Sequence, residues 1–181
     1  MLADIQHSIR MKSISTYEER VDIARHAYGY LDDMKTNPNF ENFLNVVDTL
    51  NVLNTLITVT DTEAKCKKAY NCESAHEWLW EVGHQNIIKT INDCQEGLFK
   101  TSERAEKTGS WALDGNTFAL CEECFQMYQE LYSMLPRAVI LWAIKKCAIA
   151  HKKIDENFKI QHMFFHQEYV DKENLFRSIK Q

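Results

Sequence analysis

Four side chains with sulfur or imidazole groups are spaced so that they could bind a metal ion. Cys121 and Cys124 are three residues apart in the chain, and Cys147 and His151 lie one helical turn apart further on. Two adjacent helices could bring three thiolates and one imidazole together as a tetrahedral zinc site. Zinc-binding CxxC pairs usually sit in tight turns, however, whereas this pair falls within an expected helix. Buried free cysteines that pack as small hydrophobic residues are therefore the favoured interpretation.

A second pair of imidazoles lies near the C-terminus. His162 and His166 are four residues apart, which would align them on one face of a helix. The zinc-protease motif requires a glutamate directly after its first histidine, and that position is Met163. We therefore favour two amphipathic histidines that flank Phe164 and Phe165 at a packing edge over metal-dependent hydrolysis.

Other catalytic motifs are missing from the sequence. It contains no Gly-rich phosphate loop, no GxSxG elbow and no recognisable pair of catalytic carboxylates. A cysteine nucleophile with a distant histidine stays open, because such residues are neighbours in space and not in sequence. The sequence favours a non-enzyme without a cofactor, with a zinc-stabilised module or metal-dependent enzyme as an alternative.

The composition predicts an all-α protein. The chain has 181 residues, five glycines and two prolines, and its Val, Ile and Thr residues seldom alternate as strands require. We expect a compact bundle of about five to seven helices. Residues 1–157 would form a single helical domain, and residues 158–181 an aromatic and charged C-terminal extension.

The helix expected at 136–154 is the most apolar one. All seven residues from Ala138 to Ile144 are apolar, so this helix must be covered on most sides. We expect it to be the central helix of the bundle or the seam of a homodimer. It is too short to span a membrane, which takes roughly 20 apolar residues, and no other segment is expected to do so.

Further helices are expected at 15–34, 40–57, 74–107 and 116–134, and Asn116 or Asp114 can cap the last of them. A possible capping box, Ser15 with Glu18, precedes the first of them, and the polar residues 58–73 are expected to be a connection with at most one short helix. Gly83 and Gly97 could interrupt the helix at 74–107. The segment between the last two helices has glycines at both ends and an apolar middle, which predicts an ordered turn formed by Gly109, Trp111, Leu113 and Gly115.

Aromatic residues supply the candidate protein-binding positions. Trp78 and Trp80 are two residues apart, about 200° around a helix, so both cannot face one core. Either the helix is covered on both sides, or one indole is an exposed anchor of the kind that dominates binding interfaces. The same reasoning applies to Phe164 and Phe165, and Tyr169 completes this candidate set.

The charge of the chain argues against a nucleic acid or an anionic membrane as partner. The formal net charge is −5, from 26 acidic and 21 basic residues. A basic strip could still serve a small DNA-associated regulator, although solvated ends of a buried helix are the favoured interpretation. That strip consists of Arg137, Lys145, Lys146, Lys152 and Lys153.

The N-terminus has no basic region followed by a long apolar core, so no secretory signal is expected. Six cysteines in an intracellular chain are expected to be reduced thiols. The expected localisation is cytoplasmic.

Several short motifs between Glu18 and Cys147 follow a familiar order: ERVDIARHAY, DTLNV, Arg104, GSWAL and QEL, closed by Ala143 and Ile144. In this the chain resembles small helical proteins encoded by phages, prophages and conjugative elements of proteobacteria, a family without an assigned activity. The GSWAL turn is the most distinctive motif. The chain departs from the pattern at residues 60–73 and in its C-terminal extension. The resemblance implies a genetic context and no catalytic residue.

These observations together predict an accessory protein of a phage or mobile element that acts by protein–protein binding. We expect its partner to be a host protein or nucleoprotein complex, and the genetic context points to inhibition of a host defence complex such as a CRISPR effector. A homodimer is a further expectation. Direct binding to nucleic acid is not expected, and a DNA-associated regulator is the alternative.

Overall fold

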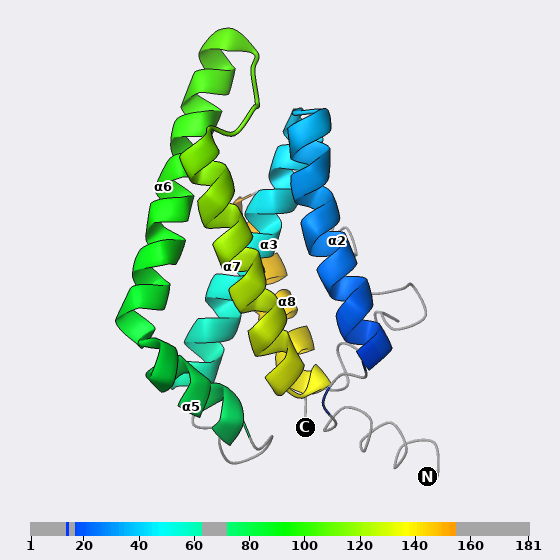
Figure 1. Ribbon diagram of the computed structural model, residues 1–181, viewed down its shortest axis with the longest axis vertical. Helices are drawn as coiled ribbons and strands as arrows, with labels where there is room; N and C mark the ends of the chain where they lie inside the picture. The colour runs from blue at the N-terminus through cyan, green and yellow to red at the C-terminus, as the bar shows by residue number, and fades with distance from the viewer. Residues whose placement is uncertain (1–13, 15–16, 63–71, 155–181) are drawn as a thin grey trace.

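The computed structural model describes residues 14, 17–62 and 72–154. Every element in this part of the chain is an α-helix, which confirms the expected all-α bundle. Phe164, Phe165 and Tyr169, like His162, His166 and Ser15, lie outside the described residues, as does the extension 158–181. The helices are α2 (Tyr17–Thr36), α3 (Phe40–Thr62), α5 (Glu73–Val82), α6 (His84–Thr108), α7 (Gly115–Met134) and α8 (Arg137–Ile154) (Figure 1).

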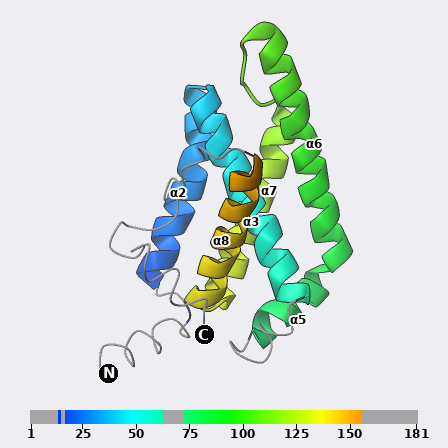
Figure 2. The ribbon, with the colours of Figure 1, turned by 180° about the vertical axis from the view of Figure 1, so that it is seen from behind.

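The central apolar helix of this bundle is α3. It contacts α2, α5, α6, α7 and α8, and α7 and α8 lie on opposite sides of it (Figures 1 and 2). The helix expected at 136–154 forms as α8, but it packs mainly on α3 and does not occupy the centre. The difference has a simple cause: α3 carries no lysine or arginine over its 23 residues, whereas the second half of α8 is rich in lysine.

Buried threonines let α3 extend beyond its expected end. Thr49 and Thr60 are fully buried, and their hydroxyls donate to the backbone oxygens of Asn45 and Leu56 at 2.8 Å each. A threonine satisfied within its own helix can be buried without an unpaired polar group. The prediction that the connection begins at residue 58 is therefore wrong, because α3 continues to Thr62.

The first half of α8 is buried within a single chain. Val139, Ile140 and Ala143 have no exposed surface, and Ala138 and Leu141 are only 6% and 7% exposed. These residues thus need no second copy of the chain to cover them.

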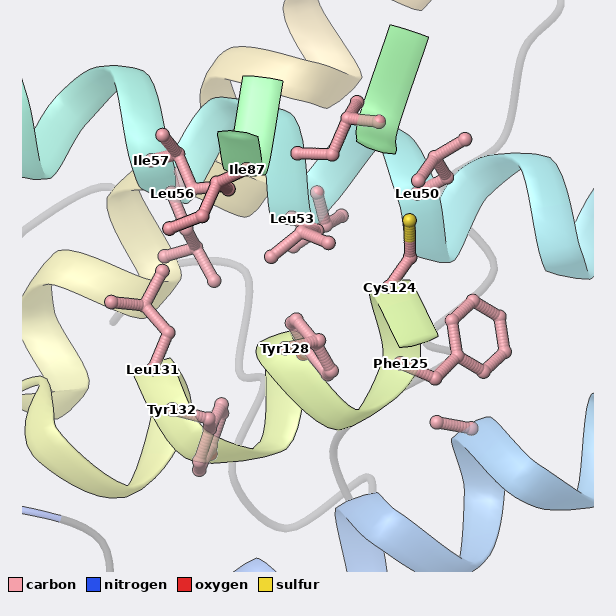
Figure 3. Packing of buried hydrophobic residues seen from close by; sticks show 14 of the residues in the cluster. Leu50, Leu53, Leu56, Ile57, Ile87, Cys124, Phe125, Tyr128, Leu131 and Tyr132 are labelled. Carbon is pink, nitrogen blue, oxygen red and sulfur yellow. The ribbon is translucent and has the colours of Figure 1, made fainter. Parts of the chain in front are cut away.

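Side chains from three helices meet in the core between α3 and α7 (Figure 3). Tyr128 of α7 is fully buried and lies opposite Leu53 of α3, and Ile87 of α6 closes the cluster from a third direction. Each large apolar side chain buried in this way stabilises the fold by about 1.5–3 kcal/mol. The core thereby fixes the position of α6 relative to α3 and α7.

Two glycines with positive φ end α5 and α6. Gly83 has φ 89° and separates α5 from α6, so the helix expected at 74–107 is two helices. Gly109 has φ 73° and its N–H donates to the oxygen of Ala105 at 2.7 Å, which closes α6 where the sequence places its end. Gly97 lies inside α6 without interrupting it.

The segment from Gly109 to Gly115 crosses from α6 to α7 over the start of α3. Trp111 packs there with ring centroids 5.0 Å from those of Phe40 and Phe43. Arg104 donates to the backbone oxygen of Ala112. These contacts hold the turn against two helices.

Asp114 is the N-cap of α7, one of the two residues expected in that role. Its carboxylate accepts a hydrogen bond from the backbone N–H of Thr117 at 2.9 Å and a second from the Thr117 hydroxyl at 2.8 Å. The cap satisfies one of the backbone donors that a helix N-terminus leaves unpaired.

One described helix is long and apolar enough to cross a membrane by length and composition. It is the part of α3 from Phe40 to Thr60, with a mean hydropathy of 1.2, and 56% of this window is buried inside the protein. The expectation that no segment reaches this length is therefore wrong. The contacts of α3 with five helices are those of a core helix.

Candidate functional site

The short helix α5 separates the two tryptophans that the sequence places on different faces. Ala75 and Leu79 of α5 are buried, which fixes the side that faces the bundle. Trp78 is half-buried against this core, and its Nε1 donates to Oε2 of Glu130 on α7 at 3.1 Å. The Trp78 indole therefore joins α5 to α7.

Trp80 points away from the bundle. Its side chain is 70% exposed, the largest exposure among the large hydrophobic residues of the described chain. Its Nε1 donates to Nε2 of His76 at 3.0 Å, and the two rings meet edge to face at an interplanar angle of 72°. A large apolar ring is thus held at the surface with one polar contact.

Three carboxylates share a face of α5 with this indole. At 100° per residue, Glu73, Glu77, Trp80 and Glu81 fall within an arc of about 100° on α5, opposite the buried Leu79. All four are exposed. We call these four residues the α5 surface. Its three glutamates are not among the residues predicted to bind, although their spacing of four residues marks one helical face.

Three thiols gather between α6 and α7. Sγ of Cys94 lies 3.5 Å from Sγ of Cys121, and Cys94 is also hydrogen-bonded to Cys124. The hydrogen bond from Cys121, followed by that from Cys124, lowers the pKa of Cys94. The hydrogen bond to Cys94, followed by burial, raises the pKa of the other two thiols. All three residues have no exposed surface, so the sulfurs do not reach a soluble substrate in the folded protein.

The four-residue metal site considered from the sequence is not assembled among the described side chains. Cys121 and Cys124 have Cys94 as their sulfur neighbour. Cys147 is half-buried on α8, where burial, followed by the charge of Asp48, raises its pKa to about 11. The side chain of His151 lies outside the described part. Within that part, no group of three His, Cys, Asp or Glu residues could hold a metal ion.

The sequence predicts that Cys94 is buried but does not predict its contact with Cys121. Cys94 follows Ile87 and Ile91 at the spacing of one helical face, which is typical of a core position. Nothing in its spacing from Cys121 indicates that α6 and α7 bring these two sulfurs together.

Two basic residues of α8 are engaged within the protein, and the side chains of Lys152 and Lys153 lie outside the described part. Arg137 is only 8% exposed, and its guanidinium donates to the backbone oxygen of Ile14 at 3.2 Å. The ammonium group of Lys146 lies 4.4 Å from the ring centroid of Trp142. Two of the five expected residues are therefore engaged within the protein.

Three other large hydrophobic side chains are exposed on the helices away from α5. Phe99 of α6 is 63% exposed, and Phe40 and Leu44 of α3 are 54% and 40% exposed. Phe40 already contacts Trp111. Phe99 also has exposed glutamates on its face of α6, but Lys100 pairs with Glu96 there. The α5 surface contains no lysine or arginine, so it is the candidate functional site.

Comparison with protein-family models, with curated proteins and with solved structures finds no significant match for this chain.

Proposed function

We propose that this protein is a non-catalytic accessory protein of a phage or mobile genetic element. It acts by binding a host protein or nucleoprotein complex, and the α5 surface is its contact site. The proposed outcome is inhibition of a host defence complex, such as a CRISPR effector.

One observation carries the binding part of this proposal: the indole of Trp80 is 70% exposed on a helix whose other indole is packed. Exposing a tryptophan to water forgoes the free energy that its burial would contribute. Tryptophan is also enriched among the residues that contribute most to binding at protein interfaces. A protein partner that covers Trp80 accounts for both facts.

The genetic part rests on the resemblance of the motifs between Glu18 and Cys147 to proteins of phages and conjugative elements. The thiol cluster offers no competing catalytic site, since Cys94, Cys121 and Cys124 are closed off from solvent.

Affinity capture from a host lysate tests the binding proposal. The wild-type chain is compared with Trp80→Ala and with Phe99→Ala, a control that removes another exposed aromatic ring, four to five turns further along the next helix. We expect one protein or complex at stoichiometric yield with the wild type and with Phe99→Ala, and its loss with Trp80→Ala. Circular dichroism checks that all three fold alike.

A phage-plating assay on a host with an active defence system tests the inhibitory part. Expression of the wild type should raise plating efficiency, and Trp80→Ala should abolish that gain. The proposal fails if no partner is retained at stoichiometric yield, or if Trp80→Ala retains it as well as Phe99→Ala does.

A further inference from the structure

The acidic residues of the described helices are unevenly distributed. α5 and α7 together carry six glutamates and no lysine or arginine. This exceeds the formal net charge of −5 of the whole chain. No basic residue other than histidine occurs from Glu73 to Ile88. The glutamates are Glu73, Glu77, Glu81, Glu122, Glu123 and Glu130.

The exposed indole lies within this acidic region. Trp80 shares one face of α5 with Glu73, Glu77 and Glu81, and α5 contacts α7. Glu130 of α7 accepts the hydrogen bond from Trp78, on the other side of α5 from Trp80, so it adds negative charge near α5 without sharing the face of Trp80. An aromatic face and several carboxylates are thus presented together.

An exposed indole beside carboxylates favours a partner with basic side chains. The face of an indole attracts a guanidinium or ammonium group, and carboxylates form charge-assisted hydrogen bonds with the same groups. An apolar partner would strip water from the carboxylates without replacing those hydrogen bonds. A nucleic acid would be repelled, because its backbone is negatively charged.

We infer that the α5 surface binds a basic segment of the partner protein, with an arginine or lysine against Trp80 and further basic side chains against Glu73, Glu77 and Glu81. This inference rests on the proposed function and specifies the partner. Proteins also use basic segments of this kind to bind nucleic acid. If the partner is a nucleoprotein complex, the α5 surface would therefore bind the segment with which that complex binds its nucleic acid.

Two synthetic peptides of equal length serve as probes, one of alternating leucine and arginine blocks and one with glutamate in place of arginine. Binding of each fluorescently labelled peptide to the full chain is followed by anisotropy at low and at high salt. We expect the arginine peptide to bind, with weaker binding at high salt, and the glutamate peptide not to bind.

Variants localise the binding. Trp80→Ala should weaken it about tenfold or more. Glu77→Gln with Glu81→Gln should weaken it several-fold at low salt and reduce its salt dependence. The matched control, Glu103→Gln with Glu106→Gln, removes two exposed carboxylates near the far end of α6 and should leave the affinity unchanged.

The inference is wrong if the arginine peptide does not bind, or if it binds the Trp80 and Glu77/Glu81 variants as tightly as the control. The capture assay reports separately on the proposed function. A partner that depends on Trp80 but tolerates the Glu77/Glu81 double variant and high salt would support the function and exclude a basic partner. Peptide binding without any captured host partner would exclude the function and support the chemistry of the surface.

Discussion

Trp78 and Trp80 come from the same short helix, yet their indole N–H groups have partners of different kinds. That of Trp78 reaches across to α7, and that of Trp80 stays within α5. The two-residue spacing alone predicts that both cannot face one core. It does not predict which one is exposed, because that depends on the side of α5 that Ala75 and Leu79 turn toward the bundle.

Asp114 allows a quantitative test at the level of one residue. Replacing this N-cap with alanine should lower the free energy of unfolding by about 1 kcal/mol at neutral pH. Hydrogen bonds from Thr117, first from its backbone and then from its side chain, lower the pKa of Asp114 below its ordinary 3.8. The carboxylate therefore contributes its stability above that ordinary value, and the contribution is lost as the pH falls through the lower pKa of the folded state.

Urea denaturation of the wild type and Asp114→Ala over a series of pH values measures this effect. The difference between them should be full above about pH 5 and shrink below about pH 4. Asn116→Ala is the control, since Asn116 was the other candidate cap and is exposed. An equal loss in Asn116→Ala, or a loss independent of pH, would contradict the assignment.

At the scale of helices, the sequence predicts the start of α3 and the end of α6 well but treats Gly83 and Gly97 alike. Gly83 has a positive φ that L-residues seldom adopt, and α5 ends there. Gly97 is helical, and its role is to let α7 approach: a Cβ atom at this position would lie 2.4 Å from Oγ1 of Thr117. That contact joins residues of two helices, so no local pattern around Gly97 reveals it.

Gly97→Ala tests this close approach. Alanine favours helix by about 1 kcal/mol over glycine, but here the overlap with Thr117 should make the variant less stable by about 1–3 kcal/mol. Gly29→Ala in α2 is a matched control, because nothing lies within 4 Å of a Cβ atom there, and it should be stabilising. Thermal unfolding followed by circular dichroism measures both.

A second substitution makes the test specific. Thr117→Ala removes two of the three atoms that the new methyl group would meet, so the Gly97→Ala penalty should be smaller in that background. If Gly97→Ala stabilises the protein as Gly29→Ala does, α6 and α7 do not pack as described.

The whole molecule is organised around a helix that the sequence does not single out as central. The continuous apolar run of α8 suggested a central helix, and its first half is indeed buried. The helix that contacts most of the others is α3. Its threonines are polar, but Thr49 and Thr60 donate their hydroxyls to backbone oxygens of the same helix and can therefore be buried. The candidate site was likewise predicted in part: the tryptophan pair could be recognised, whereas the approach of Glu130 required the packing of α5 on α7.

Leu53→Ala tests the central role of α3. Leu53 is fully buried in the middle of this helix, so the substitution should lower the free energy of unfolding by about 2–5 kcal/mol. Because α3 contacts five helices, urea unfolding monitored by circular dichroism and by tryptophan fluorescence should still give a single, coincident transition. Leu44→Ala, at a position that is 40% exposed, should cost less than half as much. Two separate transitions would show that α3 does not unite the bundle.

The two sides of α3 differ in the sign of their charge. On one side α7, with α5, carries only glutamates as charged residues, and on the other α8 carries five lysines and arginines and no acidic residue. Such a separation gives the molecule an electric dipole moment across its width. In the field of a charged macromolecule the dipole would experience a torque, so that near a cationic surface α5 and α7 would turn toward it before any side chain made contact.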